Sequence, residues 1–356
     1  MRIVFDVSPL SHPRSGVGNY IRGSLAGLVE AAGSDHEVVA FAPTSPAGAK
    51  TIRAALEGIP VETRLLRLPF AHAWRTAWSV VGYPAAERWL GPFDALHFTD
   101  WMTPPQRGGI RATTVHDLVP THFPEWTTGR TRAMHGRKDR AAQGCDVVFC
   151  NSEHTAADVE RTLGIPRERL RVAQPGLGEG FGPDGRARTL PEGPYLLTVA
   201  TLEPRKNLGT LLEAHRLLGD GPVLAVAGAA GWGGVEVSGE RVVRLGYVAD
   251  EELPALYRGA SALVYPSRFE GFGIPVIEAM ACGVPTVVSS HPSLDEACGD
   301  AAVRVDPERP AAVAAGIEEA LRRRDELVPL GLAHAARFSW ARTGEVFLRG
   351  FLEAAG

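Results

Sequence analysis

The sequence predicts an α/β protein with two doubly wound parallel sheets, one in each half of the chain. Short apolar runs alternate with helical stretches over the first half, and a second alternation of the same kind begins at Tyr195. Between the two, glycines and prolines crowd residues 174–194, as they do in linkers. A length of 356 residues is ample for two hydrophobic cores. We therefore expect one domain over residues 1–180 and a second over 181–337.

The expected strands are short apolar runs bounded by turn-forming residues. In the first half they lie at 3–7, 37–41, 95–98, 112–116 and 147–151. A helix is expected near 19–31, and a second one extends to Thr162 from Ser152, whose hydroxyl can cap it. In the second half the strands lie at 195–200, 223–227, 242–245, 262–265 and 286–289. This alternation favours ligand binding at the carboxyl ends of parallel strands.

Composition is that of an ordinary soluble globular protein, with 45% hydrophobic and 22% charged residues. The formal charge of −4 gives no reason to expect nucleic acid as a partner. Basic residues do gather locally, at Arg130, Arg132, Arg137, Lys138 and Arg140. The simpler interpretation is a solvated helix face, and the alternative is contact with an anionic acceptor or a membrane surface.

Neither the cysteines nor the N-terminus indicates export. Cys145, Cys150, Cys282 and Cys298 form no C-x-x-C pair and no metal-ligand spacing, so we expect buried free thiols in a reducing compartment. The chain begins directly with a strand-like run, and no long apolar segment follows. The expectation is a cytoplasmic protein, with peripheral contact at the inner membrane face undecided and the oligomeric state not predicted.

The most informative stretch is the run from Arg268 to Glu278, which places Glu270 and Glu278 around a glycine-rich turn. Gly273 allows close backbone approach to a ligand, and Pro275 suits the first turn of the helix that follows. Such turns are common in α/β folds for structural reasons alone. A helix start binds anions, however, and two carboxylates next to an anion are better placed to hold hydroxyl groups. A ligand that has phosphates between two sets of hydroxyl groups is a nucleotide sugar.

Here the residues resemble the E-x-F-G-x-x-x-x-E signature of the family-4 retaining glycosyltransferases, complete from Glu270 to Glu278. The downstream runs 279–288 and 301–307 are also similar to that family. The resemblance implies the GT-B fold, in which two Rossmann-like domains face each other across a cleft. It also implies that a last helix, here within 338–356, returns to the N-terminal domain. In this family the N-terminal domain binds the acceptor and the C-terminal domain binds the donor.

Two adjacent cations, Arg205 and Lys206, follow the first strand of the second half. A helix dipole disfavours cations at the helix start, so an anionic ligand is the better explanation than a pair of surface charges. The resemblance implies that they neutralise the departing nucleoside diphosphate. Because no D-x-D pair is present to hold a metal, this work is expected to fall to Arg205, Lys206 and the amides of Gly273 and Ile274. We therefore expect a metal-independent enzyme without a cofactor.

The first half offers a second set of candidates. The loop with Gly16, Val17 and Gly18 looks like the family's R-x-G-x-G-x-Y element, which would approach the donor phosphates; a lone G-x-G is otherwise weak. His116 ends a strand, and the resemblance implies that it contacts the transferred sugar. Asp117 is expected to orient its loop or to touch the acceptor. Trp101 could stack on a sugar, with a core or lid role equally open.

The remaining candidates concern the donor. Tyr247 and Ser267, with Pro266, are expected to line the nucleobase pocket, and Phe272 belongs to the donor-binding signature. Glu278 is expected to hold the ribose and Glu270 the sugar. The sequence does not identify any aspartate or glutamate as a nucleophile. The remaining mechanism is one in which the nucleoside diphosphate leaves and the acceptor attacks on the same face of the sugar, assisted by the leaving phosphate.

The sequence thus predicts a retaining hexosyltransferase that uses a nucleotide sugar and a glycan, lipid-linked glycan or small-molecule hydroxyl as acceptor. The resemblance is to the mannosyltransferase-like branch, so GDP-mannose is the first expectation for the donor and a UDP-hexose the other. Two alternatives stay open: a non-hydrolysing nucleotide-sugar epimerase, and a nucleotide-sugar-binding protein without turnover.

Overall fold

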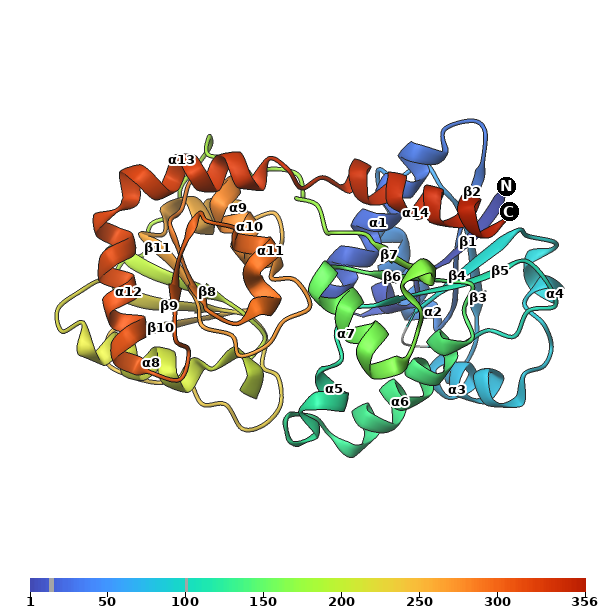
Figure 1. Ribbon diagram of the computed structural model, residues 1–356, viewed down its shortest axis with the longest axis horizontal. Coiled ribbons are helices and arrows are strands. Elements are labelled where there is room, and N and C mark those ends of the chain that lie inside the picture. The colour runs from blue at the N-terminus through green and yellow to red at the C-terminus, as the bar shows by residue number, and fades with distance from the viewer. Residues whose placement is uncertain (13–15, 100–101) are drawn as a thin grey trace. The chain divides into compact units, whose positions relative to one another are not determined.

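The computed structural model describes residues 1–12, 16–99 and 102–356, and this chain forms two compact units (Figure 1). Unit 1 comprises Met1–His122, Gly129–Gly176 and Ser339–Gly356. Unit 2 comprises Phe123–Thr128 and Leu177–Phe338. Each unit contains one parallel sheet, which confirms the predicted α/β class and the two doubly wound sheets.

Unit 1 is built on a seven-stranded sheet in the order β3-β2-β1-β4-β5-β6-β7. Its strands are β1 (Arg2–Asp6), β2 (Glu37–Thr44), β3 (Glu62–Arg67), β4 (Ala95–Phe98), β5 (Ile110–Val115), β6 (Val147–Cys150) and β7 (Leu170–Val172). Its helices are α1 (Gly16–Ala32), α2 (Pro46–Ala55), α3 (Ala71–Val81), α4 (Glu87–Leu90), α5 (Val119–His122), α6 (Gly129–Gln143), α7 (Glu153–Leu163) and α14 (Trp340–Ala354). Ser152 accepts a hydrogen bond from the Thr155 amide and caps α7, as predicted.

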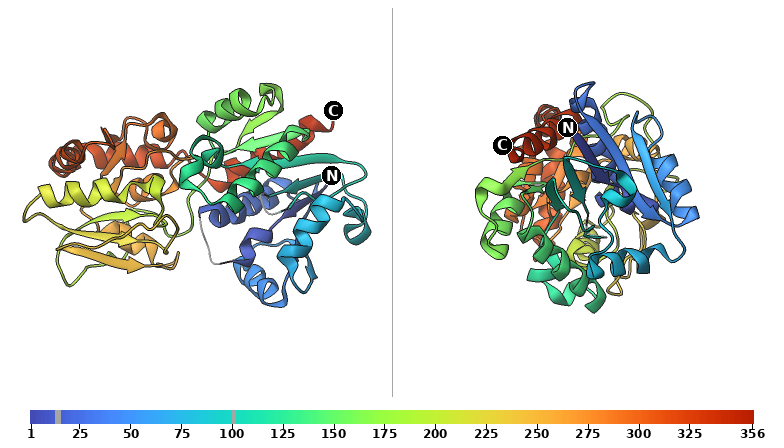
Figure 2. Two further views of the ribbon diagram at one scale, coloured as in Figure 1. Left: turned by 90° about the horizontal axis from the view of Figure 1, so that it is seen from below. Right: turned by 90° about the vertical axis from the view of Figure 1, so that its right-hand side faces the viewer.

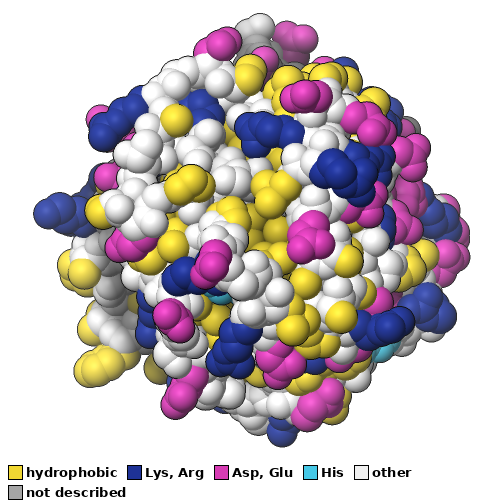
Figure 3. Space-filling model, turned by 90° about the vertical axis from the view of Figure 1, so that its left-hand side faces the viewer, with side chains coloured by type: hydrophobic (Ala, Val, Ile, Leu, Met, Phe, Trp, Pro, Cys, Tyr) yellow, Lys and Arg dark blue, Asp and Glu magenta, His cyan; other side chains and the backbone are white. Residues whose placement is uncertain are grey.

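Unit 2 has a six-stranded sheet in the order β10-β9-β8-β11-β12-β13. Its strands are β8 (Tyr195–Val199), β9 (Val223–Ala227), β10 (Val242–Gly246), β11 (Ala262–Tyr265), β12 (Thr286–Ser289) and β13 (Ala302–Val305). Its helices are α8 (Leu208–Leu217), α9 (Leu253–Gly259), α10 (Ile274–Ala281), α11 (Asp295–Cys298), α12 (Pro310–Arg322) and α13 (Arg324–Ala335). Seen from the end of this unit, acidic and basic side chains are intermingled with hydrophobic ones (Figure 3).

Consecutive strand residues point to opposite faces of the sheet, and both faces of each sheet are covered. In unit 2, Leu197 packs into a core with α9 and α10, whereas Leu196 packs into another with α8 and α12. In unit 1, Phe5 belongs to the core that contains α1 and α14, and Val4 to the one that contains α3 and α4. The strands therefore consist of nearly continuous apolar residues, which is the pattern that made them predictable. Figure 2 shows the two sheets and their helices from two further directions.

The sequence pattern misses three strands, β3, β7 and β13, and all three lie at the edge of a sheet. An edge strand pairs on one side only and carries charged residues that protect its free edge, so it lacks a continuous apolar run. β3, for example, reads Glu-Thr-Arg-Leu-Leu-Arg and contains no fully buried residue. All four cysteines are free and buried, as expected.

The C-terminal helix α14 packs on α1 within unit 1. Phe347 is fully buried and stacks on Phe149, with ring centroids 4.0 Å apart. The two helix backbones approach each other at Gly27 and Gly344, where a Cβ atom on either glycine would overlap the backbone of the other helix. Only glycine allows this approach.

This approach predicts that Gly344→Ala destabilises the protein, although alanine is the better helix former. The added methyl group must push α14 away from α1, which should lower the free energy of unfolding by ~1–3 kcal/mol. The matched control is Gly209→Ala in α8, where a Cβ meets nothing within 4 Å; it should be neutral or gain up to ~1 kcal/mol. Urea unfolding followed by circular dichroism measures both, and equal effects would contradict the close approach.

Candidate functional site

The site in unit 2 begins where β8 and β11 end. After β8 the chain forms a short 3-10 turn, Pro204–Lys206, and Asn207 then takes the left-handed conformation at φ 55°. Asparagine tolerates this region, and its side chain donates to the carbonyls of Pro266 (3.3 Å) and Pro307 (2.6 Å). The Arg268 amide donates to the Arg205 carbonyl at 2.8 Å. The turn that carries the two cations is thereby fixed to the loop that carries Glu270.

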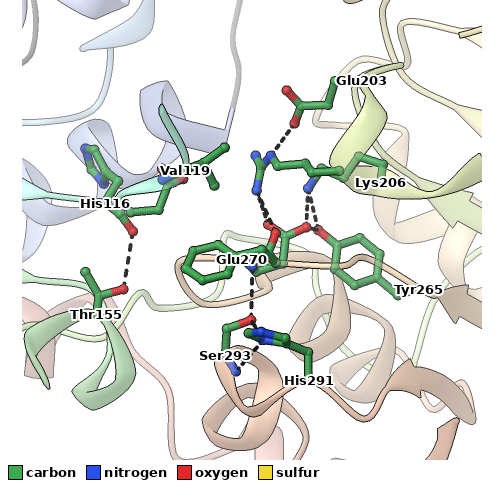
Figure 4. A network of polar contacts seen from close by, with 12 residues as sticks. His116, Val119, Thr155, Glu203, Lys206, Tyr265, Glu270, His291 and Ser293 are labelled. Carbon is green, nitrogen blue, oxygen red and sulfur yellow. Dashed lines mark hydrogen bonds and ion pairs between the residues drawn. The ribbon is translucent and has the colours of Figure 1, made fainter. Parts of the chain in front are cut away.

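Glu270 lies between the two cations (Figure 4). Arg205 Nη1 donates to Glu270 Oε2 at 2.6 Å, and Lys206 Nζ donates to Glu270 Oε1 at 2.5 Å. Tyr265, the last residue of β11, donates its hydroxyl proton to Glu270 Oε1 at 2.9 Å and accepts from Lys206 Nζ at 2.8 Å. Glu203 accepts from Arg205 Nε at 2.6 Å. Two cations and two carboxylates thus form one buried network.

The charges in this network decide its protonation. Burial alone would raise the pKa of the Glu270 carboxyl, but Arg205 and Lys206 outweigh burial and lower that pKa to about 2. Burial and the neighbouring Arg205 charge lower the pKa of Lys206, and Glu270 opposes this shift. Glu270 is therefore ionised throughout the physiological range, and its charge keeps both cations in position.

A second layer of contacts holds the backbone of the Glu270 loop. The Glu270 amide donates to Ser293 Oγ at 3.0 Å, and Ser293 Oγ lies 2.9 Å from His291 Nδ1. The Phe269 ring lies 5.3 Å from His291 and 5.5 Å from Phe123, whose segment Phe123–Thr128 belongs to unit 2. In the same segment the Trp126 carbonyl accepts from Trp232 Nε1 at 2.6 Å. The loop is thus anchored on both sides of Glu270.

The helix α10 follows directly. Its N-cap, Gly273, has φ 104° and no capping side chain, and a Cβ there would come within 2.6 Å of the Leu294 side chain. Only glycine suits this position, and it leaves the backbone amides at the helix start uncovered by a side-chain cap. Phe272 points into the core against Phe338, with ring centroids 5.4 Å apart. Phe272 therefore contributes packing that fixes the turn.

Glu278 lies one turn into α10 and is separate from the Glu270 network. The Tyr257 hydroxyl of α9 donates to Glu278 Oε2 at 2.8 Å. Burial raises the pKa of Glu278 to about 7, because no cation compensates for the lost hydration as Arg205 and Lys206 do at Glu270. The two glutamates of one signature are therefore in opposite electrostatic environments.

The residues expected at the nucleobase pocket follow two different strands of the unit 2 sheet. Ser267 follows β11 and is buried, whereas Tyr247 follows β10 and is 53% exposed. Strands β9 and β8 lie between β10 and β11 in the sheet. A shared base pocket stays a prediction.

The candidates of unit 1 lie at the carboxyl end of its sheet. His116 follows β5, its ring packs edge-on against Tyr20 at 5.0 Å, and its carbonyl accepts from Thr155 Oγ1 at 3.5 Å. Asp117 Oδ1 accepts from the Val119 amide at 3.1 Å and so orients the start of α5. Gly16 and Val17 begin α1, and a Cβ on Gly16 would meet nothing within 4 Å. Trp101 lies outside the described residues.

Sequence reasoning missed three members of these networks: Glu203, Tyr257 and Tyr265. Tyr265 ends a buried strand next to the signature, and a hydroxyl at that place is a usable signal for a polar partner. Tyr257 lies in an apolar stretch and nothing in its neighbourhood points to Glu278. Glu203 gives a signal only through its closeness in sequence to Arg205.

Chemically, this arrangement suits the binding of a strongly anionic ligand. Arg205 and Lys206 offer fixed N–H donors of positive charge, and the amides at the start of α10 add backbone donors. Among the described residues, no group of three or more His, Cys, Asp or Glu side chains could hold a metal ion.

Comparison with known proteins shows the family to which this chain belongs. The family described as "Glycosyltransferase Family 4" matches residues 14–178, and "Glycosyl transferases group 1" matches residues 186–332. O-antigen chain mannosyltransferase B of Escherichia coli is 30% identical over 383 residues, which cover 96% of each chain. This chain belongs to glycosyltransferase family 4.

Further similarities extend this result. A D-inositol 3-phosphate glycosyltransferase of Geodermatophilus obscurus is 33% identical over 317 residues, 80% of this chain and 66% of the relative. The structure of Anabaena HepE in complex with UDP-glucose matches with a TM-score of 0.68 at 18% identity, and covers 99% of this chain and 100% of HepE. That likeness supports the predicted GT-B fold. The family-4 member described here is a glycosyltransferase.

None of the described helices of this glycosyltransferase is both long enough and apolar enough to span a membrane.

The environment of Glu278 predicts a pH dependence of stability. The folded-state pKa of about 7 lies above the ordinary value of 4.5, so the folded state binds this proton more tightly than the unfolded state does. Stability therefore falls as the pH rises through this window, and Glu278→Gln removes that fall. The stability of the variant relative to the wild type should increase by ~1.4 kcal/mol between pH 6 and pH 8.5.

Urea unfolding at both pH values measures this difference. The control is Glu318→Gln, a change of the same kind at an exposed position of α12, whose difference from the wild type should not change with pH. An unchanged difference for Glu278→Gln as well would show that the buried carboxyl does not titrate near pH 7.

Proposed function

We propose that this glycosyltransferase moves a hexose from a nucleotide sugar to a hydroxyl group of a glycan or lipid-linked glycan, with retention of configuration and without a metal ion. The observation that carries the proposal is the pair Arg205 and Lys206, fixed by Glu270 next to the start of α10. Mannose is the proposed sugar and GDP-mannose the first candidate donor, because the E. coli relative is named a mannosyltransferase. HepE with UDP-glucose keeps a UDP-hexose as the other candidate.

In the proposed reaction the bond between the anomeric carbon and the phosphate oxygen breaks, and the bond to the acceptor oxygen forms on the same face. The acceptor proton passes to the leaving phosphate oxygen. Negative charge grows on the diphosphate as the bond breaks, and fixed donors at that place lower the barrier. Arg205, Lys206 and the amides of Gly273 and Ile274 are the proposed donors. This set of cations supports a reaction without a metal.

The two glutamates have different proposed roles. Glu278 binds the ribose hydroxyls of the donor, since a carboxylate with one oxygen bonded to Tyr257 keeps further lone pairs for hydroxyl donors. Glu270 already accepts from Arg205, Lys206 and Tyr265. Of about four acceptor positions on a carboxylate, three are used, so Glu270 mainly positions the cations and has room for one sugar hydroxyl.

The residues of unit 1 complete the proposal. His116 contacts the transferred sugar, and Gly16 and Val17 contribute backbone near the donor. Asp117 acts by holding the loop after β5, in keeping with its hydrogen bond to the Val119 amide. Ser267 and Tyr247 are proposed to contact the base, and Trp101 the acceptor. The protein is proposed to work in the cytoplasm, in peripheral contact with the inner face of the membrane.

The proposal predicts that Lys206→Met lowers turnover with GDP-mannose by ~100-fold at saturating donor, because one charge-stabilising group is lost. Methionine keeps most of the length of the lysine side chain and removes its charge. Lys50→Met on the exposed face of α2 is the control and should stay within twofold of the wild type. Initial rates of mannose transfer measure both. Near-normal turnover of Lys206→Met would refute the role of Lys206, and transfer from a UDP-hexose alone would reassign the donor.

Metal independence predicts that transfer survives exhaustive EDTA treatment. The protein cations already neutralise the leaving group, so the initial rate should stay within threefold, although added magnesium can speed release of the charged product. The rate is compared before chelation, after it, and after magnesium or manganese is restored. Complete loss followed by recovery with one metal would reveal a metal site and would require a new role for Arg205 and Lys206.

A further inference from the structure

Unit 1 contains a buried side-chain amide, that of Asn151, which has no part in the reaction described above. Asn151 follows β6 directly and precedes Ser152, the N-cap of α7. It is only 8% exposed. Among the residues that the structure describes, none forms a hydrogen bond with Asn151 Oδ1. Buried polar atoms nearly always have a hydrogen-bond partner, so this atom calls for an explanation.

The register of the sheet places Asn151 beside His116. The last paired residues of β5 and β6 are Val115 and Cys150. His116 and Asn151 follow these two residues directly. On the other side of β6, the Ala173 amide after β7 donates to the Cys150 carbonyl at 2.8 Å. Asn151 therefore lies at the carboxyl edge of a parallel sheet, which is where α/β proteins bind their ligands.

Tyr20 of α1 reaches over this part of the sheet edge. Its ring packs edge-on against His116, with ring centroids 5.0 Å apart, and its hydroxyl donates to the Ala173 carbonyl at 2.6 Å. These two contacts lie at the ends of β5 and β7, and β6 runs between those strands. A phenolic hydroxyl has one proton to donate, so Tyr20 is not a donor to Asn151.

The hydroxyl groups at the start of α7 are engaged as well. Ser152 Oγ donates to Thr155 Oγ1 at 3.0 Å, and Thr155 Oγ1 donates to the His116 carbonyl at 3.5 Å (Figure 4). Ser152 Oγ also accepts from the Thr155 amide and so caps the helix. The protons of these hydroxyls therefore go to acceptors other than Asn151 Oδ1.

A side-chain amide in this position suits the hydroxyl groups of a sugar. Its oxygen accepts hydrogen bonds and its NH₂ group donates them, and a hydroxyl group can do both. Two neighbouring hydroxyls of a pyranose ring can thus bind the oxygen and the nitrogen together. An anion would bind the NH₂ group alone and leave Asn151 Oδ1 unpaired. A metal ion needs several ligands, and no group of three His, Cys, Asp or Glu side chains that could hold one exists in the described chain.

We propose that Asn151 binds hydroxyl groups of a substrate sugar at the carboxyl edge of the unit 1 sheet, next to His116. The assignment to a substrate rests on the proposed function, in which His116 contacts the transferred sugar, whereas the unpaired amide does not rest on it. The sugar is either the acceptor or the transferred hexose, and both offer the same hydroxyl chemistry. The free protein loses stability by burying the amide, and the bound sugar offsets that loss.

The first test measures the stability of the free protein by differential scanning calorimetry. Asn151→Leu keeps the branched shape and removes both polar atoms, so it should leave Tm unchanged or raise it by ~2 °C, since no hydrogen bond is lost. The control is Thr113→Val in β5, which is also buried but donates to the Phe98 carbonyl at 2.9 Å. It should lower Tm by ~2–4 °C.

Asn151→Ala is the second variant, because it removes the amide without adding a methyl group. A fall in Tm as large as that of Thr113→Val in both Asn151 variants would overturn the proposal. Such a result would show that the amide is already hydrogen-bonded in the free protein.

The second test measures sugar binding without a nucleotide. Saturation-transfer NMR detects methyl α-D-mannopyranoside and methyl α-D-glucopyranoside on the full chain. Their signals should be lost in Asn151→Leu and kept in Thr286→Val. Thr286 is the matched control because its Oγ1 atom is also buried without a partner in the described chain, at the first residue of β12 in unit 2. Equal signals in the wild type and Asn151→Leu would overturn the proposal, as would the absence of any signal in the wild type.

Turnover gives an independent measure of the same contact. With GDP-mannose as donor, kcat/KM should fall by ~10–100-fold in Asn151→Leu and stay within twofold in Thr286→Val. Unchanged kcat/KM in Asn151→Leu would overturn the proposal. If the wild type binds the glycosides but transfers from neither GDP-mannose nor a UDP-hexose, the proposed function fails. Loss of glycoside binding in Asn151→Leu would still support the sugar contact in that case.

Two arms distinguish the sources of the sugar. A raised KM for methyl α-D-mannopyranoside as acceptor, with unchanged hydrolysis of GDP-mannose, assigns Asn151 to the acceptor. Slower hydrolysis of GDP-mannose with unchanged affinity for GDP assigns it to the transferred hexose. A change in neither arm would overturn the contact with a substrate.

Discussion

The ion pairs of Glu270 with Arg205 and Lys206 are the interaction on which the site of unit 2 depends. Two cations side by side in a buried place repel each other, and burial makes each of them unfavourable. The carboxylate between them compensates for both effects, and the Tyr265 hydroxyl adds a neutral bridge. The loop of Glu270 must therefore hold its backbone in place, which is what Ser293, His291 and Phe269 do. The ion pairs of Glu270 thus connect the end of β11, the turn with Arg205 and Lys206, and the start of α10.

The same loop shows why one signature contains two glutamates with different properties. Glu270 faces two cations and stays ionised, whereas Glu278 faces a tyrosine and has a pKa near neutrality. A spacing of eight residues carries the chain from the loop into the second turn of α10, where the surroundings change completely. Identical side chains thus serve as a fixed charge in one case and as a group near its titration point in the other.

Much of the fold follows from the sequence because buried parallel strands consist of continuous apolar residues. The central strands and the cap at Ser152 are predictable in this way, and the edge strands β3, β7 and β13 are not, because one side of each remains open. In the site, the signature from Glu270 to Glu278 and the pair Arg205 and Lys206 can be recognised as short sequence motifs. Tyr257 and Glu203 cannot, since their role depends on which side chain the fold brings opposite them. Lys138 is a similar case. Its charge predicts that the side chain is exposed to solvent, but the packing of α6 buries it.

The place of α14 has a consequence for the order in which the chain becomes structured during synthesis. Apart from the short segment Phe123–Thr128, unit 2 is formed by Leu177–Phe338, and unit 1 consists of segments before this stretch and of residues 339–356, which follow it. Until those last residues leave the ribosome, the surface of α1 and the rings of Phe5 and Phe149 have no Phe347 and Phe351 to cover them. All strands and helices of unit 2 are already present by then. The unit that begins first is therefore completed last, and its exposed apolar face is the part of the nascent chain that most needs protection from aggregation.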